Sequence, residues 1–313
     1  MSVGKWIEGL TARTPLVRAA RKALGLRLKR VSHHLEQALA QPFTDVEDVH
    51  HLRVGIRRAT AALKIFADCL PRKMRKRVRR RLRDLRQAAG QARDWDVFLA
   101  GLTDWQERAA GQSKKAPFLA GYAWGQRLIA QNALERKGHS RATKWKSVRR
   151  DVLKALRPPE KGATLIEWAR PTLQTALEKL RDATARDLHD DAHLHRVRIK
   201  GKRLRYAMEV FAGCFDTSFR EVVYPAVEEM QEILGRANDS RVAVGHLTEL
   251  RETLRSGRPK EWRTVQGEIT GFLRYHQRRL TRERQEFLRW LKRWHAADME
   301  NQFLALLEGK DGC

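Results

Sequence analysis

Two segments of this chain, 145 residues apart, match each other without a gap. The first reads VHHLRVGIRRATAALKIF from residue 49, and the second reads LHRVRIKGKRLRYAMEVF from residue 194. The register continues beyond them, since Gly90 falls on Gly235 and Asp94 falls on Asp239. A match of this length predicts an internal duplication, so the fold must be built from two similar halves.

Helical periodicity runs through both halves. Apolar residues recur at spacings of three and four, and no stretch of strand length alternates strictly between polar and apolar residues. Most of the nine prolines lie between the periodic stretches, where they punctuate helices. We therefore expect an all-α fold of two helical-bundle repeats, at 1–157 and 158–313, each with about four helices and related by a pseudo-two-fold axis. The junction falls in LRPPEKGAT at 156–164.

The periodicity also predicts where the helices of the first half lie. A longer segment follows the first four helices and has a candidate break at Gly138. The expected helices cover 10–40, 45–68, 72–89, 94–110 and the segment 116–156.

The charge balance limits the partners of this chain. Lys and Arg number 64 against 37 Asp and Glu, which gives a formal net charge of +27. Such an excess favours nucleic acid, an anionic membrane face or a polyanionic ligand. No apolar run approaches the roughly 18 residues of a membrane span, so we expect a cytoplasmic protein without one. The cysteines Cys69, Cys214 and Cys313 have neither metal spacing nor a disulfide framework and are expected to be free thiols.

Within each matching segment, basic and apolar side chains fall on different sides of a helix. At about 100° per residue, the positions of the basic residues share one narrow arc, and Leu52, Ile56 and Phe66 share another. The basic stripe of the first segment contains His50, Arg53, Arg57 and Lys64, and that of the second contains His195, Arg198, Lys202 and Arg205.

A solvated face is the ordinary interpretation of a charged stripe. A solvated helix face usually mixes signs, however, because like charges one turn apart oppose the helix by about 0.2 to 0.5 kcal/mol per pair. Here arginines follow arginines, and the same residue types recur in both halves. An anion held between the two stripes accounts for both observations, since Arg, Lys and His all bind phosphate through charge-assisted hydrogen bonds.

A further basic row lies between residues 71 and 86, in PRKMRKRVRRRLRDLR. Its arginines recur on one side of the expected helix, and the equivalent segment of the second half is acidic or neutral. The row is an additional candidate surface for polyanions, with a solvated face as the alternative. It consists of Arg72, Arg75, Arg79, Arg83 and Arg86.

The duplicated pattern resembles the CHAD domain, the conserved histidine α-helical domain, over about residues 25–300. In each copy a histidine is followed at fixed spacing by three basic residues and then by a phenylalanine. The resemblance implies two four-helix bundles around a basic central cavity that binds inorganic polyphosphate and brings the protein to polyphosphate granules. Carried over by position, the phosphate contacts are His50, Arg53, Arg57, Arg58, His195, Arg198, Lys202 and Arg203.

This chain departs from a strict duplication at two positions near the motif. Lys202 stands where the first copy has Arg57, which keeps the charge and loses the planar fork. Asn238 stands where the first copy has Arg93, which makes the cavity asymmetric. No Glu-x-Glu-x-Lys motif of a CYTH triphosphatase domain is found, so we expect a binding protein and not an enzyme.

Several other residues allow two interpretations. Asp94 and Asp239 follow glycines, so helix N-capping is the leading interpretation, and orientation of a cavity arginine is the alternative. Tyr206 lies next to the second stripe and is a candidate phosphate donor or a packing residue. Neighbouring histidines such as His189 and His193 have metal-ligand spacing, yet their cationic surroundings oppose a divalent ion, and we expect neither a metal site nor a cofactor.

We thus expect polyphosphate binding through the two stripes, which include Lys64 and Arg205, together with Arg58, Arg79, Arg83, Arg86, Arg203 and Tyr206. Two alternatives stay open. One is a nucleic-acid-binding protein that uses the same basic surfaces. The other is a phosphoanhydride hydrolase, for which the sequence offers no carboxylate cluster or activated nucleophile.

Overall fold

The computed structural model describes residues 4–40, 46–108, 115–159 and 163–309, with the side chains of 46 and 139–144 left aside. Within these ranges regular structure is helical, and the only β-type pairing is an isolated bridge between Pro15 and Thr164. The expectation of an all-α fold is confirmed.

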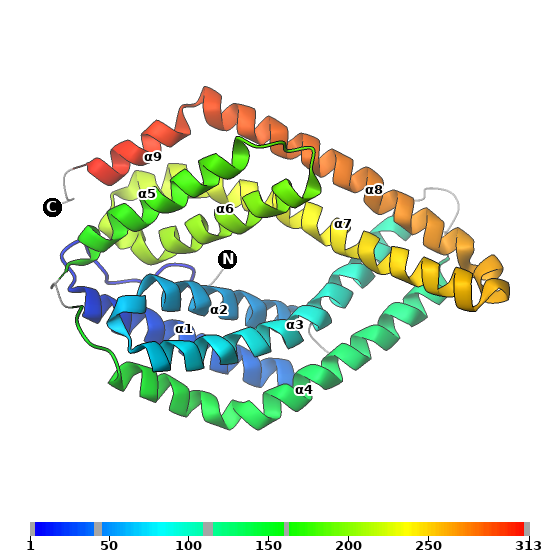
Figure 1. Cartoon of the computed structure of the whole chain (residues 1–313), viewed down its shortest axis with the longest axis horizontal. Coiled ribbons are helices and arrows are strands. Elements are labelled where there is room, and N and C mark those ends of the chain that lie inside the picture. The colour runs from blue at the N-terminus through cyan, green and yellow to red at the C-terminus, as the bar shows by residue number, and fades with distance from the viewer. Residues whose placement is uncertain (1–3, 41–45, 109–114, 160–162, 310–313) are drawn as a thin grey trace.

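The first half of the chain forms four helices that pack as a closed group. In Figure 1 they make up the lower part of the molecule. Helix α1 contacts α2 and α4, and α3 contacts the same two helices. Their bounds are Leu16–Ala40 (α1), Val46–Ile65 (α2), Arg72–Glu107 (α3) and Pro117–Lys154 (α4).

The second half follows the same order of helices and adds one more. Helix α9 contacts both α5 and α8, so the second group differs from the first at its outer side. Short helical turns η1 (Ala67–Cys69) and η2 (Ala212–Cys214) follow α2 and α6 at equivalent places, and a π-helical turn η3 (Phe219–Val223) precedes α7. The bounds are Leu165–Thr184 (α5), Asp191–Phe211 (α6), Tyr224–Gly257 (α7), Pro259–Ala296 (α8) and Met299–Glu308 (α9).

The two halves meet along their length. Helix α2 contacts α6, and α3 contacts α7. The long hairpins α3–α4 and α7–α8 extend together beyond the shorter helices, as Figure 1 shows. Two backbone hydrogen bonds also join the starts of α1 and α5, from Leu16 N to Ala163 O (2.9 Å) and from Leu165 N to Thr14 O (2.8 Å). The matching elements of the two repeats therefore lie beside each other.

Three sequence-based helix boundaries were wrong. Helix α3 is continuous from Arg72 to Glu107, where two helices were expected, and α4 runs through Gly138 without a break. A glycine inside a helix costs only about 1 kcal/mol. Burial of Ala88, Ala92 and Trp95 around Gly90 outweighs that cost. Helix α1 begins at Leu16, later than expected.

The division into 1–157 and 158–313 stays a prediction, although it agrees with the helix bounds around the junction. Helix α4 ends at Lys154 and α5 begins at Leu165, where Glu167 accepts a hydrogen bond from the backbone of Thr164 (2.7 Å). Residues 160–162 of the expected junction lie outside the described residues.

None of the helices described is both long enough and apolar enough to cross a membrane. The two longest, α4 and α8, carry basic residues along their length.

Candidate anion-binding site

The apolar faces of α2 and α6 fix the direction in which their basic stripes point. Leu52 and Ile56 on α2 and Phe66 just after it are fully buried, as are Val197 and Leu204 on α6. Both helices therefore bury the faces that the spacing predicted, and their basic sides are left to meet at the contact between α2 and α6.

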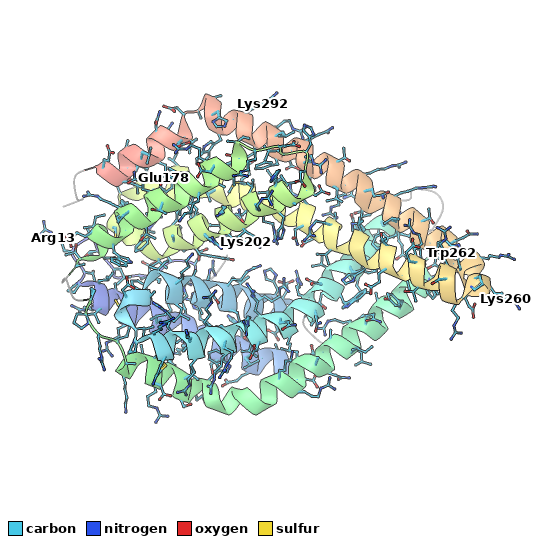
Figure 2. All side chains as sticks on the ribbon, viewed as in Figure 1. Arg13, Glu178, Lys202, Lys260, Trp262 and Lys292 are labelled. Carbon is cyan, nitrogen blue, oxygen red and sulfur yellow. The ribbon has the colours of Figure 1, made fainter. Side chains whose placement is uncertain are left out.

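Four basic side chains come together at this contact, two from each repeat. Arg53 and Arg57 on α2 and Arg198 and Lys202 on α6 are all half-buried. Each of the other three repels the charge of Lys202, and Arg53 and Arg57 repel that of Arg198. Figure 2 shows Lys202 between the two repeats. We call these four residues the inter-repeat cluster.

Crowding of like charges changes how these groups titrate. Burial, followed by repulsion from Arg198 and Arg57, lowers the pKa of Lys202 to about 6. Burial also lowers the pKa of Arg198 to about 10, although Asp239 counteracts it. At neutral pH Lys202 is thus largely uncharged in the free protein.

A glycine next to Lys202 sets how closely α6 approaches α7. A Cβ atom on Gly201 would lie 2.2 Å from Nε2 of Gln231 and 2.4 Å from Cε of Met230. Both atoms are the ends of flexible side chains, so a side chain at this position would require Gln231 and Met230 to move. Helices α6 and α7 therefore pack closely beside Lys202.

The two aspartates lie beside the cluster and not at helix ends. Asp94 is inside α3 and Asp239 inside α7, so the N-capping interpretation was wrong. Asp94 Oδ1 is 3.6 Å from Nη1 of Arg53, and Asp239 attracts Arg198. The orienting role that was considered second is therefore the one that agrees with the geometry.

Gly90 on α3 lies beside the Arg53 guanidinium and the carboxylate of Asp94. It lies one turn before Asp94 on α3, and a Cβ at this position would be 3.0 Å from Nη1 of Arg53. The absence of a side chain lets the Arg53 guanidinium lie against α3 beside the carboxylate. The equivalent Gly235 has no atom within 4 Å of its Cβ position.

The cluster has hydrogen-bond donors without acceptors. Nε of Arg57 and Nε of Arg198 are buried and have no hydrogen-bond partner among the residues that the structure describes. Among the described residues, Arg57, Arg198 and Lys202 form no ion pair with a carboxylate within 4.0 Å. Unpaired buried donors are rare because each costs about 1 to 3 kcal/mol. An anion would satisfy them.

The two motif histidines lie at the edge of the cluster. His50 is close to Arg57 and to Arg93, and burial followed by the repulsion of Arg93 lowers its pKa to about 4. Burial followed by the repulsion of Arg241 lowers the pKa of His195, although a hydrogen bond with Asn238 counteracts it, and the buried Nδ1 has no hydrogen-bond partner among the described residues. Both histidines are therefore neutral at pH 7 in the free protein and can donate one hydrogen bond each.

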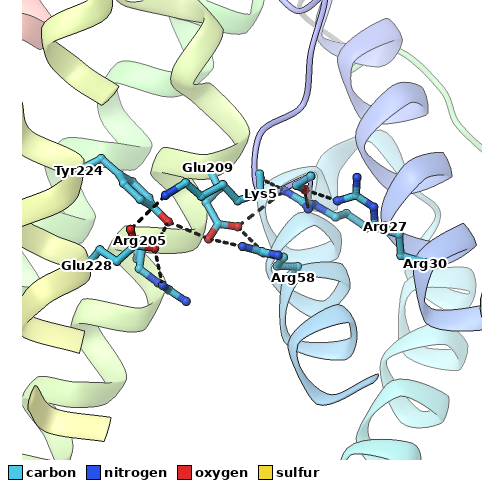
Figure 3. Close-up of polar contacts among 9 residues, drawn as sticks. Lys5, Arg27, Arg30, Arg58, Arg205, Glu209, Tyr224 and Glu228 are labelled. Carbon is cyan, nitrogen blue, oxygen red and sulfur yellow. Dashed lines mark hydrogen bonds and ion pairs between the residues drawn. The ribbon is translucent and has the colours of Figure 1, made fainter. Parts of the chain in front are cut away.

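Arg58 has a different environment from the other predicted contacts. Its Nε and Nη2 donate to Oε2 and Oε1 of Glu209 on α6, at 2.6 and 3.1 Å. Tyr224 also donates to Glu209 (3.2 Å), and Arg27 lies 3.7 Å from it. Figure 3 shows this buried network between the repeats. Arg58 is thus held by an internal carboxylate and joins α2 to α6.

Arg205 faces α7, whereas Tyr206 is buried and interacts electrostatically with Arg198 of the cluster. Arg205 donates to Glu228 (3.2 Å), which also accepts from Lys5 (3.0 Å), as Figure 3 shows. The Arg205 guanidinium lies 5.2 Å from the ring centre of Tyr206, which is buried. These contacts favour a packing role for Arg205, whereas the buried hydroxyl of Tyr206 has no hydrogen-bond partner among the described residues, so both interpretations of Tyr206 stay open.

The remaining predicted residues are exposed. Lys64 and Arg203 lie at the surface beyond the cluster, and the row on α3 points to solvent except for Arg75, which donates to the carbonyl of Ala67 (3.1 Å). The exposed members of that row are Arg72, Arg79, Arg83 and Arg86.

Sequence reasoning missed three residues near the site. Glu209 and Arg27 are fully buried in the network of Figure 3, and Arg241 lies beside His195. One feature of the repeat pointed to Glu209: the equivalent residue of the first half is Lys64, which has the opposite charge. No signal pointed to Arg27, whose role depends on contacts between α1 and distant segments.

A pocket of about 20 Å³ lies next to the cluster, lined by His195, Arg198, Asn238 and Arg241 among others. Arg93, which occupies the place of Asn238 in the first repeat, pairs with Glu47 (3.3 Å).

Within the described parts of the chain, no group of three His, Cys, Asp or Glu residues is arranged to hold a metal ion.

Comparison with known proteins agrees with the repeated motif. A model of the CHAD domain matches residues 22–248. A crystal structure of the CHAD domain from the plant Ricinus communis superposes with a TM-score of 0.67 at 25% identity, covering 92% of this chain and 95% of that one. PptA from Streptomyces chartreusis superposes with a TM-score of 0.67 at 19% identity, covering 89% and 100%. No curated protein matches the sequence.

Proposed function

Because the chain belongs to the CHAD domain family, we propose that it binds inorganic polyphosphate at the inter-repeat cluster, without hydrolysing it. The observation that supports this most is the pair of buried Nε donors on Arg57 and Arg198, which have no acceptor among the described residues and lie in a cluster with few carboxylates. Phosphate oxygens are strong acceptors for such donors. Both repeats contribute equally, which suits a ligand that lies between them.

The proposed contacts are narrower than the set expected from the motif. Arg53, Arg57, Arg198 and Lys202 bind phosphate, and His50 and His195 donate at the edges. Arg58 is left out because Glu209 occupies its guanidinium. Asp94 and Asp239 orient the arginines, as the Arg53 to Asp94 distance indicates.

The test is a comparison of thermal unfolding with two ligands. Long-chain polyphosphate raises Tm far more than orthophosphate does at equal phosphate concentration, because a ligand that binds the folded state stabilises it by mass action. Equal shifts with the two ligands would contradict the proposal.

Nucleic acid is the second polyanion to test, because the α3 row is exposed and one-sided. In competition at physiological salt, duplex DNA and RNA displace bound polyphosphate poorly if the inter-repeat cluster is the site. Efficient displacement would favour the nucleic-acid alternative.

The absence of hydrolysis is tested directly. We expect no release of orthophosphate from polyphosphate with Mg²⁺ or Mn²⁺ above the background of a boiled sample. Release that a His50 or His195 substitution abolishes would instead identify a phosphoanhydride hydrolase.

In cells, the proposal places the protein at polyphosphate granules. A fluorescent fusion is expected to colocalise with stained granules and to become diffuse when polyphosphate synthesis is removed. A diffuse signal in granule-containing cells would contradict this part.

A further inference from the structure

One side of α4 exposes large apolar side chains to solvent. Trp124, Leu128 and Ile129 are 52%, 47% and 61% exposed and lie within two turns of the helix. In the part of the chain that the structure describes, the other large apolar side chains that are exposed are Ile199 and Val222, which lie apart on α6 and in η3. Single exposed apolar residues are ordinary, whereas neighbouring ones form a patch that marks a binding surface.

The patch continues over neighbouring residues of the same helix. By helical spacing Gly121 and Gly125 lie among the three side chains, and no atom lies within 4 Å of a Cβ built on either glycine. Tyr122, about two turns before Ile129, is half-buried and stacks on Phe118 with ring centres 6.4 Å apart. The outer side of this part of α4 is therefore open, and its aromatic and aliphatic groups lie close together.

No exposed charge interrupts this surface. From Pro117 to Leu134 the chain has a single charged residue, Arg127. Arg127 is buried and pairs with Asp96 on α3, so its guanidinium points away from the patch. Of the whole chain, 32% of residues are charged, so an uncharged surface of this length needs an explanation.

The second repeat shows that the fold does not require such a patch. Helix α8 follows α7 as α4 follows α3, and both α4 and α8 have 38 residues and begin with a proline. Helix α8 is described in full and has no exposed large apolar side chain. Counted from the first proline, Trp124 and Leu128 correspond to Gln266 and Thr270. Packing within a repeat therefore does not account for the patch on α4.

The other half of α4 is basic on its outer side. Its two carboxylates, Glu135 and Asp151, are half-buried, and Asp151 pairs with Arg77 on α3 (3.1 Å). Figure 1 shows α4 along the lower edge of the molecule, outside α1 and α3. Among the side chains described on α4, those that are both charged and exposed are all cations: Arg136, Lys146, Arg149, Arg150 and Lys154.

We propose that this outer side of α4 docks onto an anionic lipid surface. Trp124, Leu128 and Ile129 enter the boundary between headgroups and acyl chains, and the basic half of the helix lies against the lipid phosphates. Interfacial helices bind in this way, through apolar side chains combined with Lys and Arg. Tryptophan and tyrosine favour the same boundary. The inference uses residues outside the inter-repeat cluster and does not rest on the proposed function.

Charge complementarity favours a lipid surface over a second copy of this chain as the partner. Each copy has a formal net charge of +27, and two copies that met along α4 would bring their basic halves close to each other. Their charges repel, whereas anionic headgroups attract every cation that comes near the membrane surface. The apolar patch and the basic half thus favour the same partner.

The test measures how the full chain partitions onto lipid vesicles, by sedimentation. The unmodified protein is expected to bind vesicles of phosphatidylglycerol and phosphatidylcholine in equal parts, and not vesicles of phosphatidylcholine alone. Trp124→Gln with Leu128→Gln is expected to lower the partition coefficient for the anionic vesicles about tenfold, because the apolar surface that enters the bilayer is lost. Undiminished binding by this double variant would contradict the proposal.

Leu128→Gln and Val222→Gln form a matched pair of single variants, because both side chains are 47% exposed. Val222 lies in η3 of the second repeat, outside the proposed surface. We expect only Leu128→Gln to lower the partition coefficient. Equal losses in the two variants would mean that exposed apolar groups act without regard to place, and would overturn the assignment to α4.

Tryptophan fluorescence gives a readout of which side chain enters the bilayer. In anionic vesicles with brominated acyl chains, the fluorescence of the unmodified protein is expected to be partly quenched, since bromine quenches tryptophans that reach the acyl region. Trp124→Phe keeps the patch apolar and is expected to retain binding but lose the quenching. Quenching that persists in this variant would place another part of the chain in the bilayer.

The alternative partner is tested in the same samples. No binding of the unmodified protein to anionic vesicles would overturn the proposal. A dimer in analytical ultracentrifugation that Trp124→Gln with Leu128→Gln dissociates would then identify the patch as the contact with a second copy.

Discussion

The two repeats present similar side chains to each other and different ones to solvent. At their contact, Arg53 and Arg57 face Arg198 and Lys202, with one aspartate behind each pair. On the outside, α3 begins with a row of arginines where the equivalent part of the second half is acidic or neutral. Among the basic side chains, the similarity is therefore greatest where the repeats meet, as the proposed shared ligand requires.

The largest effect is expected from removing one arginine of the cluster from each repeat. Arg53→Ala with Arg198→Ala weakens polyphosphate binding by about 100-fold or more, since each charge-assisted hydrogen bond is worth about 1.5 to 3 kcal/mol. The slope of affinity against salt also falls, by about 0.7 for each phosphate that the variant no longer neutralises. Titration calorimetry at several salt concentrations measures both.

Arg274→Ala with Arg289→Ala is the matched control for that double variant. Both arginines are exposed on α8 and form no ion pair with described residues. Similar losses in the two double variants would mean that total charge, and not the meeting of the repeats, determines binding.

The contact that joins the repeats is tested by removing its carboxylate. Glu209→Leu leaves Arg58 and Arg27 buried without their counterion and is expected to cost about 3 to 5 kcal/mol in the free energy of unfolding. Urea denaturation measures this cost. The double variant Arg58→Met with Glu209→Leu is expected to recover part of it, and no recovery would contradict the assigned role of Arg58.

The difference between Lys202 and Arg57 predicts a pH dependence of binding. In the free protein Lys202 has a pKa of about 6 because of burial and the repulsion of Arg198, Arg57 and Arg53, which Asp239 offsets only partly. A bound polyanion favours the charged form, so binding takes up a proton above pH 6. The affinity therefore falls as pH rises above 6, by up to about tenfold per pH unit.

Lys202→Arg serves as the matched variant, because it restores the residue of the first repeat and stays charged. Its affinity is expected to vary less between pH 6 and 9 than that of the unmodified protein. A pH profile that the substitution leaves unchanged would remove Lys202 from the site.

The smallest effect is expected on the exposed row of α3. Arg83 and Arg86 point to solvent, and Arg83 lies 4.0 Å from Asp84. Arg83→Gln with Arg86→Gln is expected to weaken polyphosphate binding less than about threefold, because exposed charges contribute little at physiological salt. A loss as large as that of the cluster variant would move the site to α3.

The spacing of residues predicted the buried faces and the direction of the stripes. Leu52 and Val197 are buried where the helical period required, because burial follows periodicity. The roles of Asp94 and Glu209 could not be predicted in this way. Asp94 follows a glycine that packing keeps inside a helix, and Glu209 acquires its partner only when α2 meets α6.

The most direct test of a ligand held between the repeats is a crystal structure grown with long-chain polyphosphate. We predict phosphate oxygens within hydrogen-bonding distance of Nε of Arg57 and Nε of Arg198. A chain bound along the exposed arginines of α3, with no anion between α2 and α6, would contradict the account.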